Sequence, residues 1–175
     1  MMRLIQKIIG LVFFHFIFHA GAVMAVEEPT YQVLQAEPPF ELRRYAEFVV
    51  AETKLTGDFD SASRAGFRRI AGYIFGDNEV KGGGNRKIAM TAPVVMNLGD
   101  SASMYFVMPS AYKKDALPRP SASNVTIEEE VSKTLAVLQY GGFSSDEKIK
   151  SHCEQLKKSL TEQGIKTVGS FMYMG

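Results

Sequence analysis

Residues 87–96 read KIAMTAPVVM and follow three glycines at positions 82–84. Odd and even positions of this stretch both carry apolar or small side chains, which is typical of a strand buried on both faces. Pro93 lies near its centre and donates no hydrogen bond to a neighbouring strand, so we expect a bulge or a sheet edge there. The stretch therefore predicts a strand over residues 87–96 with apolar neighbours on both sides.

The first 25 residues predict a secretory signal peptide. Arg3 and Lys7 give a positive start, residues 8–24 are mostly apolar, and Val23 and Ala25 stand where signal peptidase reads small residues. An uncleaved membrane anchor is the alternative, but the apolar run is short for a span of about 20 residues and contains two histidines. We expect cleavage after Ala25. Residues 1–25 would then be the signal peptide and 26–175 a periplasmic or secreted domain without stable membrane insertion.

The charge balance and the few Cys and His residues of the mature part exclude several classes of function. Without the signal peptide, 18 Lys and Arg residues stand against 19 Asp and Glu, so the basic surface of a nucleic-acid-binding protein is not expected. Cys153 is the single cysteine, so the domain must be held by its core without an internal disulfide. His152 is the only histidine after the signal peptide, and His152 with Cys153 cannot make a zinc site alone.

Two similar sets of elements follow one another along the chain. The first set has strands over 31–35 and 40–54, a helix capped by Asp60 that runs to about 75, and strands over 87–96 and 104–108. The second has strands over 124–131 and 134–140, a helix capped by Ser144 and ending near 163, and a strand over 166–174. This order, ββαββ and then ββαβ, predicts a pseudo-symmetric α+β domain whose last strand is missing.

Three segments together resemble the SOUL haem-binding family. They are FELRRY with VVAET (40–45 and 49–53), IAMTAPV (88–94), and FVMP with LPRP (106–109 and 117–120). The resemblance implies a curved, mainly antiparallel sheet that carries two helices on one side, a fold related to GyrI-like effector-binding domains. It also implies non-covalent binding of haem or another tetrapyrrole, and no enzyme activity. Family members continue past the region of Tyr173 with one further strand, which this sequence lacks.

Two regions could hold such a ring. Arg64 and Arg68 lie one turn apart beside an apolar helix stripe, and cationic side chains next to an apolar surface suit the propionates of haem. His152 borders the apolar stripe of the second helix and is the candidate axial ligand of the iron. We predict a site near the first helix and the 87–96 strand, formed by Arg64, Phe67, Arg68, Ala71, Met90 and His152.

Each of these residues also has a purely structural interpretation. Arginines on a helix flank commonly do no more than solvate it, and methionines or aromatic residues at helical spacing usually fill a core. A histidine at a helix edge is often only hydrogen-bonded.

We expect an exported protein that binds haem or a related porphyrin for transport, storage or buffering. A first alternative is a module for other lipophilic or cationic small molecules, which would need buried acids; Glu41, Glu47 and Glu52 are the candidates. A second alternative is an enzyme. It lacks an evident nucleophile–base pair, because the adjacent His152 and Cys153 would point about 100° apart on a helix.

Overall fold

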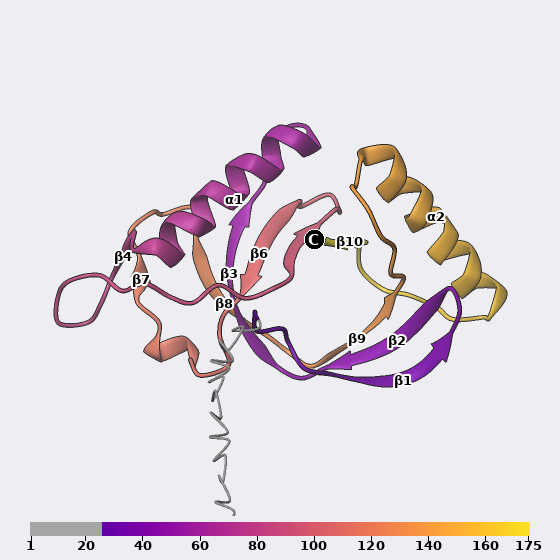
Figure 1. Cartoon of the computed structure of the whole chain (residues 1–175), viewed down its shortest axis with the longest axis horizontal. Coiled ribbons are helices and arrows are strands. Elements are labelled where there is room, and N and C mark those ends of the chain that lie inside the picture. Colours follow the sequence, from indigo (N-terminus) through magenta and orange to yellow (C-terminus); the bar gives the residue numbers. More distant parts are fainter. Residues whose placement is uncertain (1–25) are drawn as a thin grey trace, which may run out of the picture.

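The computed structural model describes residues 26–175, and the predicted signal peptide lies outside these described residues (Figure 1). The part that is described has two helices and mainly antiparallel strands, so the α+β class is confirmed. In chain order the elements are β1 (Tyr31–Glu37), β2 (Phe40–Tyr45), β3 (Phe48–Lys54), α1 (Phe59–Phe75), β4 (Asn78–Glu79), β5 (Val94–Asn97), β6 (Ser103–Val107), a 3-10 turn (Lys114–Ala116), β7 (Arg119–Pro120), β8 (Thr126–Glu130), β9 (Lys133–Val137), α2 (Asp146–Glu162) and β10 (Met172–Met174).

The strands form two main sheets, which the two halves of the chain share. A three-stranded sheet has the order β1-β2-β9, a five-stranded sheet has the order β10-β5-β6-β3-β8, and β4 pairs with β7. The predicted 40–54 strand is broken at residues 46–47, so β2 belongs to the first sheet and β3 to the second. β8 and β9 divide in the same way, because β8 pairs with β3 and β9 pairs with β2. Each half therefore contributes one strand of this pair to each sheet, and β1 is an additional strand of the first half.

Helix α1 covers one face of the five-stranded sheet. It starts two residues before the predicted position, because the carboxylate of Asp58 accepts a hydrogen bond from the backbone N–H of Ser61 at 3.0 Å and caps the first turn. It ends at Gly76, whose φ of 126° favours glycine, as the sequence indicates. Its buried residues are Ala62, Gly66, Ile70, Tyr73 and Ile74. All of them except Gly66 belong to one core cluster with side chains from β3, β5 and β6.

The 87–96 stretch is a strand only in its last part. Residues 87–93 are irregular and β5 begins at Val94, directly after Pro93, which has no N–H to give to a ladder. The predicted burial on both faces is confirmed for β5. Val95 and Met96 are 2% and 5% exposed, and they belong to core clusters on opposite faces of the sheet. The strand expected over residues 87–93 is wrong.

Two further boundaries differ from the expectation. Helix α2 is capped by Ser145, whose hydroxyl oxygen accepts from the N–H of Lys148, so the predicted cap at Ser144 is one residue early. The strand expected over 166–174 is reduced to Met172–Met174, which pairs antiparallel with β5.

Besides β1, the two halves differ in strand β6. β6 lies between β3 and β5 in the first half, and all five of its residues are buried. The counterparts of β3 and β5 in the second half are β9 and β10, and within residues 26–175 no strand lies between these two. Helix α2 has two buried residues, Ile149 and Leu160, where α1 has five.

Candidate ligand-binding site

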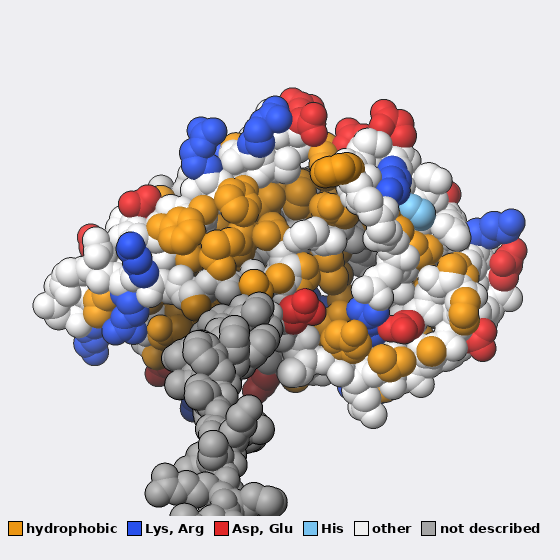
Figure 2. Space-filling model, in the orientation of Figure 1, with side chains coloured by type: hydrophobic (Ala, Val, Ile, Leu, Met, Phe, Trp, Pro, Cys, Tyr) orange, Lys and Arg blue, Asp and Glu red, His pale blue; other side chains and the backbone are white. Residues whose placement is uncertain are grey.

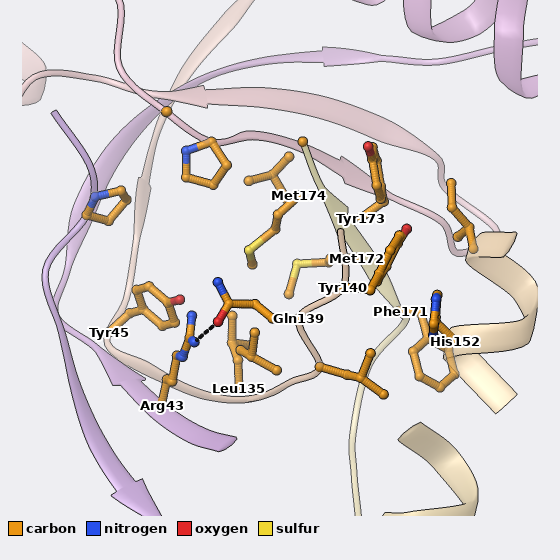
Figure 3. A pocket seen from close by; sticks show the side chains of 18 of the residues that line it. Arg43, Tyr45, Leu135, Gln139, Tyr140, His152, Phe171, Met172, Tyr173 and Met174 are labelled. Carbon is orange, nitrogen blue, oxygen red and sulfur yellow. Dashed lines mark hydrogen bonds between the residues drawn. The ribbon is translucent and has the colours of Figure 1, made fainter. Parts of the chain in front are cut away.

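A cavity of about 580 Å³ occupies the space between the two sheets and α2 (Figure 3). Cavities of roughly 300–1,000 Å³ are typical of small-molecule sites. We call this cavity the interior cleft. Its apolar walls come from both sheets and from α2; they include Val95, Tyr105, Val107, Leu135, Val137, Ile149, Leu156, Met172 and Met174.

Arg43 on β2 places a cation in one end of the interior cleft. Its side chain is buried, with 7% of the residue exposed. Its Nε donates to the Glu41 carboxylate at 2.8 Å, one terminal nitrogen donates to the Gln139 carbonyl oxygen at 3.0 Å, and its guanidinium carbon lies 4.4 Å from the Tyr31 ring centre. Burial lowers the pKa of Arg43, but the hydrogen bonds to Glu41 and Tyr45 outweigh it and the pKa is raised. Arg43 therefore keeps its charge.

His152 and Tyr140 form the other end of the interior cleft (Figure 3). Their rings stack at a centroid distance of 4.0 Å and an interplanar angle of 22°. The Nδ1 of His152 lies 3.2 Å from the side-chain oxygen of Gln155. An amide oxygen can only accept, so this contact is a hydrogen bond when Nδ1 carries a proton, and Nε2 is then the ring nitrogen left for another partner.

The middle of the interior cleft is lined by apolar, flexible side chains. Met172 and Met174 project from β10 between the two ends (Figure 3). The Tyr105 hydroxyl lies 3.7 Å from the sulfur of Met172. Burial, reinforced by the charges of Glu130 and Glu52, raises the pKa of Tyr105, so this hydroxyl stays neutral. The centre therefore offers adaptable, uncharged contacts to a flat ring.

Cys153 lines the interior cleft beside His152. Burial is the main cause that raises the pKa of its thiol, and the charge of Glu154 adds to the effect. A raised thiol pKa is the opposite of what an activated nucleophile needs.

The residues predicted on α1 lie elsewhere. Arg64 and Arg68 are exposed, Phe67 is 43% exposed and packs against Phe106, and Met90 is exposed on the segment before β5. Ala71 is half-buried. Apolar side chains gather beside α1 on the face shown in Figure 2. Of the predicted set, only His152 lines the interior cleft, so the structure does not bring the six residues together.

A second hollow, of about 1100 Å³, lies beside β8 and the loop over 110–115. Six carboxylates and two lysines line it. This excess of acids disfavours an anionic ligand.

Metal binding and membrane spanning are both limited by the side chains of the described residues. Among residues 26–175, no group of three or more His, Cys, Asp or Glu side chains is placed to hold a metal ion. Neither α1 nor α2, nor any other helix within that range, is long and apolar enough to span a membrane.

Comparison with known proteins identifies the family. The sequence profile of the SOUL heme-binding protein family matches residues 26–175. The chain belongs to the SOUL family. It is 32% identical to Heme-binding protein 2 of Mus musculus over 153 residues, and this aligned region covers 80% of this chain and 72% of that protein. It is 31% identical over 157 residues to Heme-binding protein 2 of Homo sapiens, covering 82% and 74%. Heme-binding protein 1 of Xenopus laevis is 31% identical over 130 residues, covering 69% and 66%.

Sequence reasoning missed Arg43 as a site residue of this SOUL chain. Arg43 belongs to the FELRRY segment that carries the family resemblance, and it shares a strand face with Glu41 and Tyr45. A charged residue between two side chains of the inner face is a signal for a functional cation. Its partner Gln139 lies 96 positions away, so the sequence alone could not show the pairing.

Proposed function

We propose that this SOUL protein binds haem or a related porphyrin reversibly and without a covalent link. The observation that supports this most strongly is the interior cleft, with apolar walls and one buried guanidinium, in a chain of the SOUL heme-binding family. A porphyrin needs an apolar slot for its ring and cations for its propionates. The names of the relatives, Heme-binding protein 1 and Heme-binding protein 2, point to the same ligand class.

The residues present fit this ligand. Arg43 would pair with a propionate, the methionines of β10 and the inner face of the five-stranded sheet would contact the ring, and His152 is the imidazole available for iron. Haem, when bound, would supply an iron centre. The α1 face with Arg64 and Arg68 stays a second predicted surface for the ring.

The charge of the interior cleft favours an anionic ligand over a cationic one. Among the residues 26–175 that line it, Glu28 is the one acidic side chain. Of the acids that a cation-binding module would use, Glu41 bonds to Arg43, Glu47 is exposed, and Glu52 does not line the interior cleft. The acids of the second hollow are mostly exposed, where solvent and salt screen their attraction.

Binding, and not catalysis, is the role we propose. His152 contacts Gln155 and Tyr140, and neither contact pairs it with Cys153. The raised thiol pKa argues against a Cys nucleophile. We further propose export after cleavage behind Ala25, with the ring transported, stored or buffered outside the cytoplasm. The intact mass of protein recovered from the periplasm or the medium tests this, since cleavage predicts Val26 as the first residue.

A titration tests the ligand class. Residues 26–175 are titrated with haemin and with iron-free protoporphyrin while the Soret band is followed. We expect saturable one-to-one binding of both at micromolar protein. If the two bind equally, iron ligation contributes little and His152→Ala should leave both affinities unchanged. If neither binds, the proposed function is wrong.

A further inference from the structure

We propose that the exposed side of α1 and the loop that follows it dock the protein on the surface of a bilayer that contains anionic lipids. We call this surface the basic face. It consists of Arg64, Phe67, Arg68, Ala71 and Phe75 on the helix and of the loop over residues 81–90. The proposal goes beyond porphyrin binding and does not depend on it, because no residue of the basic face lines the interior cleft.

The charges of the chain are divided unevenly between two regions. Residues 61–99 carry six Lys and Arg against Asp77 and Glu79, a net charge of +4. The rest of residues 26–175 carries 12 Lys and Arg against 17 Asp and Glu, a net charge of −5. The domain is therefore almost neutral as a whole but polarised, with α1 and its loop in the positive region. Anionic lipid headgroups attract such a region.

Most of these cations are free to meet a phosphate group. Five of the six are exposed, and within residues 26–175 none of them forms a salt bridge; they are Arg64, Arg68, Lys81, Arg86 and Lys87. The sixth, Arg69, is half-buried and donates to the carbonyl oxygen of Lys54 at 3.0 Å. The five exposed side chains keep their donors for charge-assisted hydrogen bonds to a ligand.

The helix part of the basic face is aromatic as well as basic. Its five residues recur every three or four positions, so they share one side of α1, and the buried residues of the helix lie on the other side. Phe67 is 43% exposed and Phe75 is 56% exposed. Figure 2 shows apolar side chains beside α1 with Lys and Arg side chains at the border of this patch. Exposed apolar patches mark interaction surfaces, and cations beside aromatic rings are typical of helices that lie in a membrane interface.

Hydrogen bonds fix the loop beside the end of α1. The side chain of Asn78 forms three of them, at 2.7–2.9 Å, one with the backbone of the last turn of α1 and two with the backbone of Arg86. The N–H of Ile88 donates to another carbonyl oxygen of that turn at 2.9 Å. Arg86 and Lys87 are therefore held next to the end of the helix that carries Phe75.

Met90 extends the apolar part of the basic face. It is 43% exposed and precedes Thr91, whose hydroxyl donates to the carbonyl oxygen of Val107 at the end of β6. The ring of Phe67 lies 5.6 Å, between centroids, from that of Phe106 on the same strand. The end of β6 thus brings Met90 and Phe67 to neighbouring parts of the surface.

A bilayer fits the basic face better than the other occupants considered. Neither of the two hollows described above is lined by any of residues 59–90, so the face contributes nothing to those cavities. A second copy of the chain would bring two positive surfaces together. A bilayer offers negative headgroups to the cations and an apolar layer to the phenylalanines at the same time.

Co-sedimentation with vesicles tests the proposal. Residues 26–175 are used, because the apolar stretch over residues 8–24 would itself bind lipid. Vesicles of phosphatidylcholine are compared with vesicles in which about one third of the lipid is phosphatidylglycerol, at an ionic strength of about 0.1 M.

Three variants locate the contact. Arg64→Gln with Arg68→Gln removes two charges from the basic face, and Phe75→Ser removes apolar surface without changing the charge. Lys157→Gln with Lys158→Gln is the matched control, because it removes two exposed charges from α2. Far-UV circular dichroism checks that each variant is folded.

We expect the wild type to bind the anionic vesicles and not phosphatidylcholine alone. The α1 double variant should weaken binding about 25-fold, about fivefold for each charge. Phe75→Ser should weaken it about fivefold, and the α2 double variant should stay within about twofold of the wild type.

Four results would overturn the proposal. They are absence of binding to the anionic vesicles, equal weakening by the two double variants, unchanged binding of Phe75→Ser, and release by sodium phosphate beyond that by sodium chloride of equal ionic strength. The second would show that only the total charge matters, the third that no apolar contact forms, and the fourth that the face binds free anions. Porphyrin titrations of the same proteins report on the proposed function separately.

Discussion

Tyr73 gives a quantitative test of how α1 is held on the sheet. Its side chain is 1% exposed, and its hydroxyl donates a hydrogen bond to the carbonyl oxygen of Pro118 at 3.0 Å. Burial, with a smaller contribution from Tyr112, raises the pKa of Tyr73 to about 12. The perturbation is Tyr73→Phe, which keeps the ring and removes the hydroxyl.

The expected effect depends on pH. An unfolded tyrosine loses its proton near pH 10, whereas the folded one holds it to about 12. Above pH 10 the unfolded state therefore binds fewer protons and is favoured, so stability is lost as pH rises through this window. At pH 11.5 the loss from this one group is about 2 kcal/mol. At pH 8 the Phe variant should be less stable by about 1–3 kcal/mol, because a buried carbonyl loses its partner.

The assay is urea unfolding of wild type and variant at pH 8 and pH 11.5, followed by far-UV circular dichroism. Other groups, including Tyr105 with its raised pKa, titrate in both proteins and cancel in the difference. The stability difference between the two proteins should shrink by about 2 kcal/mol between the two pH values. An unchanged difference would refute the reasoning.

Other predictions concern the core, a loop anchor and the single thiol. Val95 and Met96 are buried on opposite faces of the sheet, so we expect Val95→Ala to lower the free energy of unfolding by about 1.5 kcal/mol and Met96→Ala by about 2–5 kcal/mol. The exposed control Met90→Ala should lower it by less than about 0.5 kcal/mol, as measured by urea unfolding. A negligible loss of stability at either buried position would contradict two-faced burial. Asn78→Ala removes three hydrogen bonds that join the end of α1 to residue 86, and should cost about 3 kcal/mol, seen as a lower melting temperature. An unchanged melting temperature would show that these bonds contribute nothing net. Cys153 should react with a maleimide more slowly than a free thiol at pH 7.5, because burial raises its pKa, and urea should remove the difference; equal rates without urea would contradict its partial burial.

Patterns local to the sequence predicted much of the fold. The two helices, the end of α1 near residue 75 and the two-faced burial of β5 depend on residues close together in the chain, and these are confirmed. The errors lie at element boundaries, where a single side chain sets the first residue of a helix or strand. Asp58 caps α1 in place of Asp60, and β5 begins only after Pro93.

The arrangement of the site could not be predicted in the same way. Pairing of β2 with β9 brings Arg43 to Gln139, and pairing of β10 with β5 brings Met172 and Met174 into the interior cleft. Neither pairing leaves a trace in local periodicity. The helix stripe with Arg64 and Arg68 is visible in the sequence, but which face of the sheet it covers depends on the whole fold.

Protection of Cys153 by a bound porphyrin tests the central claim most directly. Cys153 is the single cysteine of the chain and lines the interior cleft, so the rate of maleimide alkylation reports on that cavity alone. Iron-free protoporphyrin is the probe, because it cannot ligate the thiol through iron. The account predicts that alkylation slows several-fold and that the slowing saturates at the same concentration as the Soret change. A saturated Soret change with an unaltered alkylation rate would place the ligand outside the interior cleft and contradict the account.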